Sequence, residues 1–389
     1  MTNLNIEVPR RPERRELDTH WAAIQQRLSS ALAEQVPAES SVAYVDYPIH
    51  GNTGDQMLML GTEEWFRRSR FRVIGRWHVD NFRFPDLPPE TIIICHAGGN
   101  MGDLYRYQRH REAIVRAYPD HRIVFLPQTI FYRSRDRLRQ TADLLRRHDD
   151  LHLFVREQNS YELADSELDT TTLTLVPDIA SFLYPVCETL DCRGPKTTGR
   201  YDVLYLMRRD WEWTAVTPIP KRSRFARPPD VLSVINPLRG GGSPMSDPGS
   251  QNATCIDWHE TAPLEMYQAW TSLAAVFLVG RMLPARWFHR RWERLARRMF
   301  VRGVHAIQGA ECLVTNRLHA HLLASMVGTP SIVLDNSYGK CSAYFDTWHS
   351  DLSFARFFDQ GIVKPDELFT GIPRDVTREL TESGGNDVS

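Results

Sequence analysis

The first periodic pattern of apolar residues along the chain is helical. Apolar side chains recur at spacings of three and four residues, at Leu17, Trp21, Ile24, Leu28 and Leu32. Such spacing makes one face of an α-helix apolar, so it predicts an amphipathic helix over about residues 16 to 34. We expect this face to pack on the first domain.

Short runs rich in β-branched and aromatic residues follow, and they alternate with helical segments. The runs are VAYVDY (42–47), FRVIGRW (71–77), TIIIC (91–95), RIVFL (122–126), LHLFV (151–155) and LTLV (173–176). Strands separated by helices predict a parallel, doubly wound sheet, and continuous apolar runs such as TIIIC are typical of strands covered on both faces.

The alternation stops at CETLDCRGPKTTGR (187–200), which is typical of a linker, and then starts again. The later segments are YDVLYLM (201–207), VLSVI (231–235), a long helix around 264–282, CLVT (312–315) and SIVLD (331–335). We therefore predict an α/β fold with two Rossmann-like βα domains facing across a cleft. The first takes residues 1–190, the second residues 196–350, and a C-terminal helix and frayed tail take residues 351–389.

Composition narrows the class of protein. A chain of 389 residues with 42% apolar and 24% charged residues is typical of a soluble protein of two domains. The net charge of -1 gives no reason to expect nucleic acid as a partner. Six scattered cysteines without a C-x-x-C pair favour the cytoplasm, and no run reaches the ~18 apolar residues of a membrane span. Any contact with a membrane is expected to be peripheral.

Two glycine loops follow predicted strands. HGNTGDQ (50–56) and HAGGNMGD (96–103) each join a strand to a helix. Glycine lets the backbone approach a ligand, and loops at the carboxyl ends of neighbouring parallel strands line one crevice. Both loops could equally be tight turns in which an aspartate caps the next helix. The candidate residues are Asn52, Gly54, Asp55, Gly98, Gly99, Asn100 and Asp103.

Arginine stands at the ends of two further strands. Arg156 opens RE-x-x-S, and Arg208 and Arg209 follow YLM. Arginine forks two hydrogen bonds onto a carboxylate or phosphate, although Arg156 could equally be a structural ion-pair partner. Of Arg208 and Arg209, at most one should face the cleft, because neighbouring side chains of a strand point in opposite directions. Asp178, in VPDIASF, could face the cleft or cap a turn.

The segment TNRLHAH (315–321) carries the sharpest local signal. Asn316 is expected to cap a helix, which places Arg317 and His319 in its first turn. A cation there opposes the helix dipole unless an anion binds, so the placement favours an anionic ligand. His319 is a candidate acid–base group or a structural histidine. His319 and His321 lie on different helix faces and cannot chelate one ion, so we expect no metal.

These motifs in this order, ending with NSYGK, resemble the polysaccharide pyruvyl transferase family over roughly residues 50 to 345. The most specific part is Arg317-Leu318-His319, followed by Gly328 and Pro330. Family members often have three glycines where this chain has Ala97-Gly98-Gly99. The resemblance implies a two-domain fold like that of GT-B glycosyltransferases, and no cofactor. It also implies phosphoenolpyruvate as donor and a sugar of a lipid-linked exopolysaccharide repeat unit as acceptor.

The resemblance also implies roles for the candidate residues. His319, Asp55 and Asp103 become acid–base candidates, and the donor site takes Asn316, Arg317, Leu318, Arg208 and Arg209. The acceptor or loop residues are Asn52, Gly54, Gly98, Gly99, Asn100, Arg156 and Lys340. Two alternatives remain: a GT-B glycosyltransferase that uses a nucleotide sugar, and a sugar-binding module without activity.

Residues 281–302, RMLPARWFHRRWERLARRMFVR, hold eight arginines and one acid, Glu293. The aromatic and apolar residues among them repeat at nearly helical spacing. One interpretation is a buried apolar stripe beneath a solvated charged face. The other is a basic surface that meets the cytoplasmic face of the inner membrane, with its aromatic side chains at the level of the lipid headgroups.

Overall fold

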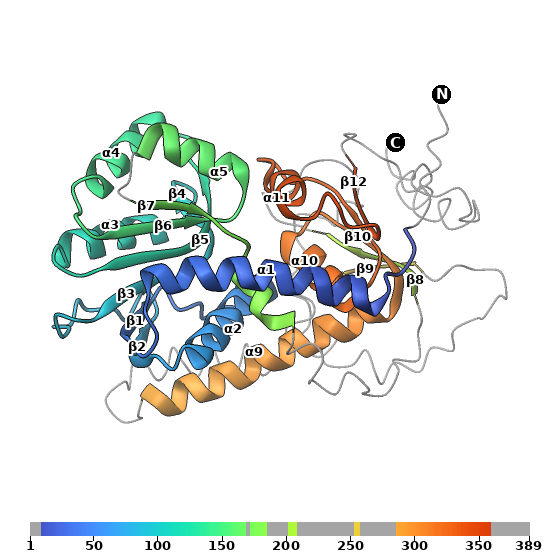
Figure 1. Ribbon diagram of the computed structural model, residues 1–389, viewed down its shortest axis with the longest axis horizontal. Coiled ribbons are helices and arrows are strands. Elements are labelled where there is room, and N and C mark those ends of the chain that lie inside the picture. The colour runs from blue at the N-terminus through green and yellow to red at the C-terminus, as the bar shows by residue number, and fades with distance from the viewer. Residues whose placement is uncertain (1–8, 169–171, 185–200, 208–252, 257–284, 359–389) are drawn as a thin grey trace, which may run out of the picture.

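The protein contains two parallel β-sheets flanked by helices (Figure 1). The computed structural model describes residues 9–168, 172–184, 201–207, 253–256 and 285–358. The α/β class and the parallel sheets predicted from the sequence are confirmed.

The first sheet has seven strands in the order β2-β1-β3-β5-β6-β7, with β4 paired to β5 outside this path. Its strands are β1 (Ser41–Val45), β2 (Arg72–Trp77), β3 (Ile92–Cys95), β4 (Gly98–Gly102), β5 (Ile123–Phe131), β6 (Leu151–Val155) and β7 (Thr172–Leu175). All six runs predicted for this half form strands, whereas β4 was not predicted. Val45 pairs with Cys95, and Cys95 with Phe125, so β1 and β3 end beside each other and beside β5.

The second sheet has five strands in the order β12-β11-β10-β8-β9. They are β8 (Tyr201–Leu206), β9 (Ala253–Ile256), β10 (Ala310–Thr315), β11 (Ser331–Val333) and β12 (Ala355–Phe357). β12 pairs with β11, so this sheet continues past residue 350, where we had placed the domain end. The predicted strand 231–235 and helix 264–282 lie outside the described residues.

Helices surround both sheets. They are α1 (Arg14–Gln35), α2 (Thr53–Arg68), α3 (Tyr107–Ala117), α4 (Arg135–Leu145), α5 (Gln158–Leu163), the π-helix η1 (Ala164–Leu168), the 3-10 helix η2 (Ile179–Leu183), α9 (Ala285–Gln308), α10 (Leu318–Val327) and α11 (Lys340–Trp348). Within the described part of the chain, no helix is both long and apolar enough to cross a membrane.

Helix α1 is amphipathic as predicted, because its five periodic apolar residues are all buried. Its partners differ from the prediction. It contacts η2 of the first half and also α10 of the second, where the Trp21 indole N–H donates to the Ser325 carbonyl at 3.3 Å. The helix therefore packs on both halves instead of the first domain alone (Figure 1).

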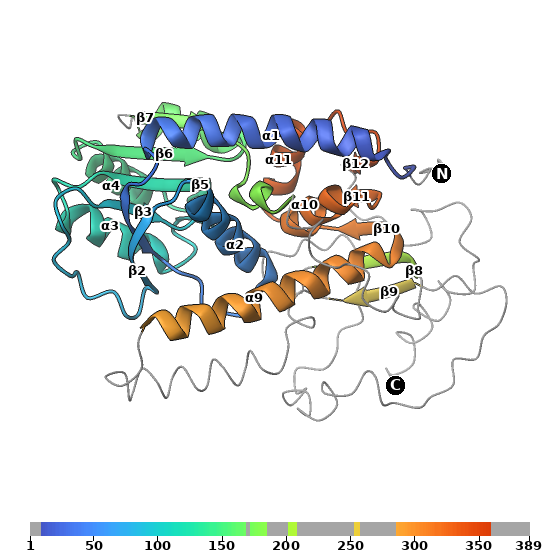
Figure 2. The same cartoon turned by 60° about the horizontal axis from the view of Figure 1, so that its bottom comes forward.

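Helix α9 joins the two halves on the opposite side (Figure 2). It packs on α2 and α10, and the Trp292 indole N–H donates to the Pro48 carbonyl at 2.9 Å and to Gln56 Oε1 at 3.1 Å. Its apolar residues Trp292, Leu295, Met299 and Phe300 are buried in the largest hydrophobic core. The first interpretation of residues 281–302, a buried apolar stripe, is confirmed for this part of the helix.

Candidate functional site

The first glycine loop enters α2 through an asparagine cap. Asn52 Oδ1 accepts from the Gly54 N–H at 3.0 Å, so Asn52 caps the helix, and the predicted cap by Asp55 is wrong. The side-chain amide N–H of Asn52 donates to Asp55 Oδ2 at 2.8 Å, and His50 Nε2 lies 3.6 Å from the same oxygen. Because Asn52 satisfies the helix end, the Asp55 carboxylate is directed to other partners.

The second glycine loop forms β4 and lies against the first. Gly98 has φ +119°, and a β-carbon there would lie 3.0 Å from Leu58 Cδ1 and 3.8 Å from Asp55 Oδ1. The half-buried Asn100 belongs to the same strand. Ala97 is buried and does not have positive φ, so its methyl group is accommodated before Gly98.

Asp103 has a different task from the predicted one. Its two oxygens accept from the backbone N–H groups of Arg133 and Ser134, both at 2.8 Å, and so hold the turn that precedes α4. The helix after the loop begins at Tyr107, and its N-cap, Arg106, makes no capping bond. The prediction that Asp103 caps that helix is therefore wrong.

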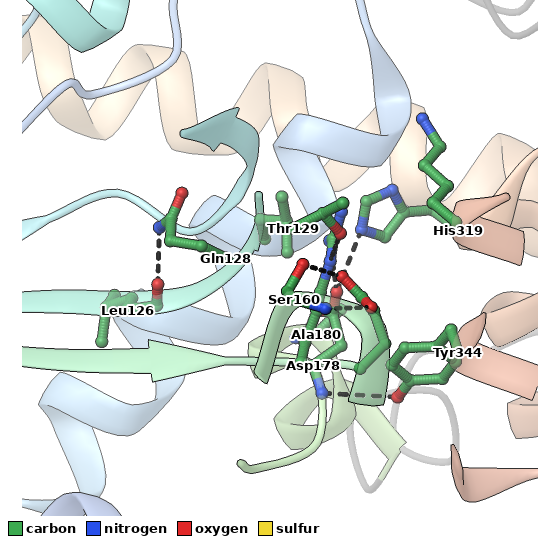
Figure 3. Close-up of polar contacts among 12 residues, drawn as sticks. Leu126, Gln128, Thr129, Ser160, Asp178, Ala180, His319 and Tyr344 are labelled. Atoms are coloured by element: carbon green, nitrogen blue, oxygen red, sulfur yellow. Dashed lines mark hydrogen bonds and ion pairs between the residues drawn. The ribbon is translucent and has the colours of Figure 1, made fainter. Parts of the chain in front are cut away.

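A buried ion pair lies at the ends of β6 and β7. Arg156 donates from Nη1 to Asp178 Oδ2 at 2.7 Å and from Nε to Thr129 Oγ1 at 2.8 Å. Asp178 also caps η2, because its Oδ1 accepts from the Ala180 N–H at 2.8 Å. The cap predicted for Asp178 is thus confirmed, and the same carboxylate also binds Arg156 (Figure 3).

Electrostatics keep this pair ionised. Burial acts to raise the pKa of the Asp178 carboxyl, but His319, Arg156 and the Ala180 N–H hold it well below its usual range. Burial likewise acts to lower the pKa of Arg156, and Asp178 more than compensates.

His319 completes the site from the second half of the molecule. Its Nε2 lies 3.4 Å from Asp178 Oδ2, with the ring directed at the first half (Figure 3). On the other side, a β-carbon at Gly54 would lie only 2.6 Å from His319 Nδ1. The ring can therefore lie here only because residue 54 has no side chain. Gly54, Asp178 and His319 join the first glycine loop, η2 and α10 in one site.

Helix α10 begins one residue later than predicted. Its N-cap is Arg317, whose N–H donates to Thr315 Oγ1 at 3.0 Å, so the cap predicted at Asn316 is wrong. The Arg317 side chain is buried at this helix start, whereas the Leu318 side chain belongs to the hydrophobic core. Leu318 can thus serve the site through its backbone and by anchoring the helix.

His321 leaves the site and points into the core. Its Nδ1 is 3.1 Å from Ser331 Oγ, and its Nε2 is 2.7 Å from His349 Nδ1. The two histidines of TNRLHAH diverge, as their spacing predicted. Among the described residues, no three His, Cys, Asp or Glu side chains are grouped to hold a metal ion.

Lys340 approaches the second glycine loop through a tyrosine. Its Nζ donates to Tyr338 Oη at 2.9 Å, and a β-carbon at Gly99 would lie 3.6 Å from that Oη and 3.8 Å from Arg156 Nη2. The Tyr338 ring also lies 4.8 Å from that of Phe131. The site thus includes Gly99, Arg156 and Lys340, while Arg208 and Arg209 lie outside the described residues.

Three side chains that hold this site were not predicted from the sequence. Thr129 binds Arg156, the Tyr344 hydroxyl accepts from the Asp178 N–H at 3.3 Å, and the Trp348 indole N–H donates to the Arg156 carbonyl at 2.8 Å. Thr129 follows RIVFL in β5, and the other two lie in α11, where nothing local marks them.

The remainder of RE-x-x-S is structural. Glu157 caps α5 by accepting from the Ser160 N–H at 2.9 Å and from its hydroxyl, and Ser160 Oγ accepts from the Ile130 N–H at 2.7 Å. Burial raises the pKa of Glu157. These bonds fix α5 to β5 and so fix the backbone that carries Arg156.

Comparison with known proteins identifies the family. Residues 52–338 match the family model described as polysaccharide pyruvyl transferase. The candidate residues of both glycine loops, Arg156, Asp178, Arg317 and His319 lie within this span. The chain belongs to this family. It is therefore a transferase, and the resemblance drawn from its motifs is confirmed.

Individual relatives agree with this placement. The chain is 33% identical over 344 residues to EpsO of Bacillus subtilis, whose name describes it as a pyruvyl transferase. The match covers 88% of this chain and 95% of that protein. It is 25% identical over 319 residues to pyruvyl transferase 1 of Schizosaccharomyces pombe, covering 79% and 69%. A solved Klebsiella pneumoniae structure of an uncharacterized protein shares the fold, with a TM-score of 0.52 and 17% identity over 87% of this chain and 99% of that one.

Proposed function

We propose that this pyruvyl transferase uses phosphoenolpyruvate as donor and forms a pyruvate ketal on two hydroxyls of a sugar in an exopolysaccharide repeat unit. The observation that carries the proposal is the position of His319, between the ionised Asp178 and the glycine loop at Gly54. The reaction needs a proton donor beside an anionic substrate, and a carboxylate-oriented histidine meets that need.

The atoms balance as follows. The methylene carbon of phosphoenolpyruvate takes one proton, and two sugar oxygens form bonds to the carbon that bears the carboxylate. The bond from that carbon to the phosphate ester oxygen breaks. The sugar hydroxyls lose two protons. One restores the acid that protonated the methylene carbon, and the other leaves with hydrogen phosphate. No cofactor is required.

His319 is the proposed acid–base group. Asp178, kept ionised, orients its Nε2 side, while Nδ1 faces the first glycine loop. Asp55 is the proposed base for the sugar hydroxyl, in preference to Asp103, because both Asp103 oxygens already accept backbone N–H groups. Arg317, buried at the start of α10, is proposed to bind the anionic donor together with Arg208 or Arg209.

Phosphate release from phosphoenolpyruvate tests the proposal, measured with and without lipid-linked oligosaccharide. We expect release that depends on the acceptor, and a loss of 10²–10⁴-fold in His319→Gln with little change in melting temperature. A GT-B glycosyltransferase would instead release nucleoside diphosphate from a nucleotide sugar, and a binding module would release neither. Early melting of His319→Gln with full specific activity would show that the histidine is structural.

We also propose that the protein works at the cytoplasmic face of the inner membrane and binds it peripherally through α9. Exposed arginines follow one another along this helix, at Arg290, Arg291, Arg294, Arg298 and Arg302. Each basic side chain near an anionic lipid surface contributes ~1 kcal/mol. Trp292 and Phe300 are buried, so the proposed contact is electrostatic and does not use these rings.

A further inference from the structure

A second buried charged cluster lies beneath the glycine loops, and the chemistry proposed above does not use it. Its centre is Arg111 of α3, which is fully buried. Arg111 Nε donates to Asp46 Oδ2 at 2.6 Å, and His110 Nδ1 lies 2.8 Å from Asp46 Oδ1. Gln128 Oε1 accepts from Arg111 Nη1 at 2.9 Å. We call Asp46, His110, Arg111 and Gln128 the Arg111 cluster.

The cluster fixes the start of the second glycine loop through hydrogen bonds to one backbone oxygen. The carbonyl oxygen of His96 accepts from Arg111 Nη2 at 2.7 Å and from Gln128 Nε2 at 2.8 Å. His96 directly follows β3 and lies two residues before Gly98. Both lone pairs of this carbonyl are therefore engaged by side chains from α3 and β5, which fixes where the loop leaves the sheet.

The cluster also holds the start of the first glycine loop. Asp46 directly follows β1 and has φ +60°, a left-handed conformation that costs free energy in a residue other than glycine. Its carboxylate, bound to Arg111 and His110, keeps this turn in place, and the pKa of Asp46 falls to about 2, because these two partners outweigh the effect of burial. One guanidinium therefore connects the two strand ends from which both loops begin.

The positions of the loops matter because their contacts are close. The first loop places Gly54 against His319, and the second places Gly98 beside Asp55 and Gly99 beside Arg156. A small shift of the first loop would change its contacts with His319 and Gly98, and a shift of the second would change its contacts with Asp55 and Arg156. A buried ion pair is also weak as a source of stability, because desolvation offsets much of its attraction. Stability alone does not account for its location.

We propose that Arg111 is a positioning residue that sets the two glycine loops against each other and against His319. Its side chain binds Asp46, Gln128 and the His96 carbonyl, none of which is proposed to contact donor or acceptor. The expected kinetic consequence rests on the proposed function, whereas the expected structural consequence does not.

Two variants test the positioning role. Arg111→Lys keeps the charge but loses the fork that binds Asp46, Gln128 and His96 together. Gln128→Met keeps the ion pair and removes one of the two donors to the His96 carbonyl. Arg122→Lys is the matched control, because Arg122 also binds one carboxylate, Asp150, and one backbone carbonyl, that of Gln35, but just before β5 begins, at the other end of the sheet.

Hydrogen–deuterium exchange measures how readily the backbone of the loops opens, without any assay of activity. In both test variants we expect exchange of residues 96–102 to be at least tenfold faster, with β6 and β7 unchanged, and kcat for phosphate release to fall at least tenfold. Arg122→Lys should leave the loops and kcat as in the wild type.

Wild-type exchange in residues 96–102, or acceleration spread evenly over the chain, would overturn the positioning role. If Arg111→Lys does not fold, Gln128→Met carries the same comparison. If the wild-type protein releases no phosphate from phosphoenolpyruvate, the proposed function fails, and the exchange data still decide the role of Arg111.

Discussion

His319 has one place to lie because its neighbours on both sides define it. Asp178 attracts Nε2 at 3.4 Å, and the absence of a side chain at Gly54 makes room for Nδ1. Asp178 is in turn held by Arg156 and by the Ala180 N–H. The role of a single histidine is usually ambiguous in a sequence, but here Asp178 and Gly54 of the other half give His319 a definite orientation.

The glycine is the most direct test at the residue scale. In Gly54→Ala the new methyl carbon would lie 2.6 Å from His319 Nδ1 unless the ring moves away from Asp178. Because a side chain can rotate more cheaply than a backbone can shift, we expect kcat to fall at least tenfold with a nearly unchanged melting temperature. Gly99→Ala, whose β-carbon would make only ordinary contacts, should lose far less. Full turnover in Gly54→Ala would contradict this account of the site.

The two aspartates of the loops should respond differently to loss of charge. Asp55→Asn removes the proposed base, while Asn52 still caps α2, so activity should fall without loss of fold. Asp103→Asn keeps one acceptor for the turn before α4, and removing the other should lower stability by about 1 kcal/mol rather than turnover. Thermal melting and phosphate release, measured on both variants, separate the two roles. The reverse pattern would assign the base to Asp103.

At the scale of elements, a histidine cluster joins α1, α10 and α11. His20 of α1 lies 5.2 Å, centre to centre, from the ring of His349, which follows α11, and His349 is bonded to His321 of α10. Burial lowers the pKa of all three, that of His321 to about 3, and neighbouring histidines lower those of His321 and His349 further. Asp351 and Glu16 act on His20 in the opposite direction.

This cluster predicts a pH dependence of stability. The unfolded chain binds protons at these histidines below pH ~6.5, whereas in the folded protein His321 and His349 bind them only at far lower pH, and His20 at lower pH than when unfolded. The free energy of unfolding should therefore fall as the pH drops below 6.5, by up to ~1.4 kcal/mol per pH unit for each such histidine. Urea midpoints at pH 7.5, 6.0 and 5.0 measure it, and His349→Phe should flatten the slope.

Asp46 and Asp178 do not confound that measurement. Asp46 and Asp178 have lowered pKa values in the folded protein, so the stability that they contribute is present above pH ~4 and is lost only as the pH falls further. A urea midpoint that stays constant between pH 7.5 and 5.0 would show that the histidines are not buried as neutral groups.

At the scale of the whole molecule, two long helices join the halves. α1 contacts η2 and α10, and α9 contacts α2 and α10, on opposite sides of the molecule (Figure 2). Because each helix is anchored to elements of both halves, residues far apart along the chain meet in one site. The same arrangement leaves exposed an arginine face of α9, formed by Arg290, Arg291, Arg294, Arg298 and Arg302.

That face makes a prediction about membranes. Sedimentation with anionic vesicles at low salt should recover the protein, and recovery should fall with added salt and in Arg290→Glu combined with Arg294→Glu. Neutral phosphatidylcholine vesicles and a variant with Arg135→Glu and Arg139→Glu, on α4, serve as controls. Absence of binding to anionic vesicles at low salt would exclude the proposed contact.

Local patterns determined much of this protein from the sequence alone. The five apolar residues of α1, the continuous apolar run of β3 and the Arg317-Leu318-His319 motif are each recognised within a few neighbouring residues, because helix and strand periodicity are local properties. They were sufficient for the α/β class, most strand positions in the described residues, and the family.

Only the tertiary structure decided which residues meet. In the folded protein Asn52 rather than Asp55 caps α2, and Asp103 binds the turn before α4. Helices α1 and α9 each pack on both halves. Arg156 pairs with Asp178, 22 residues away, and His319 packs against Gly54, although the two are far apart in the sequence. The physical reason is that such contacts depend on how the sheets and helices pack, and residues that meet only through packing share no local pattern along the chain.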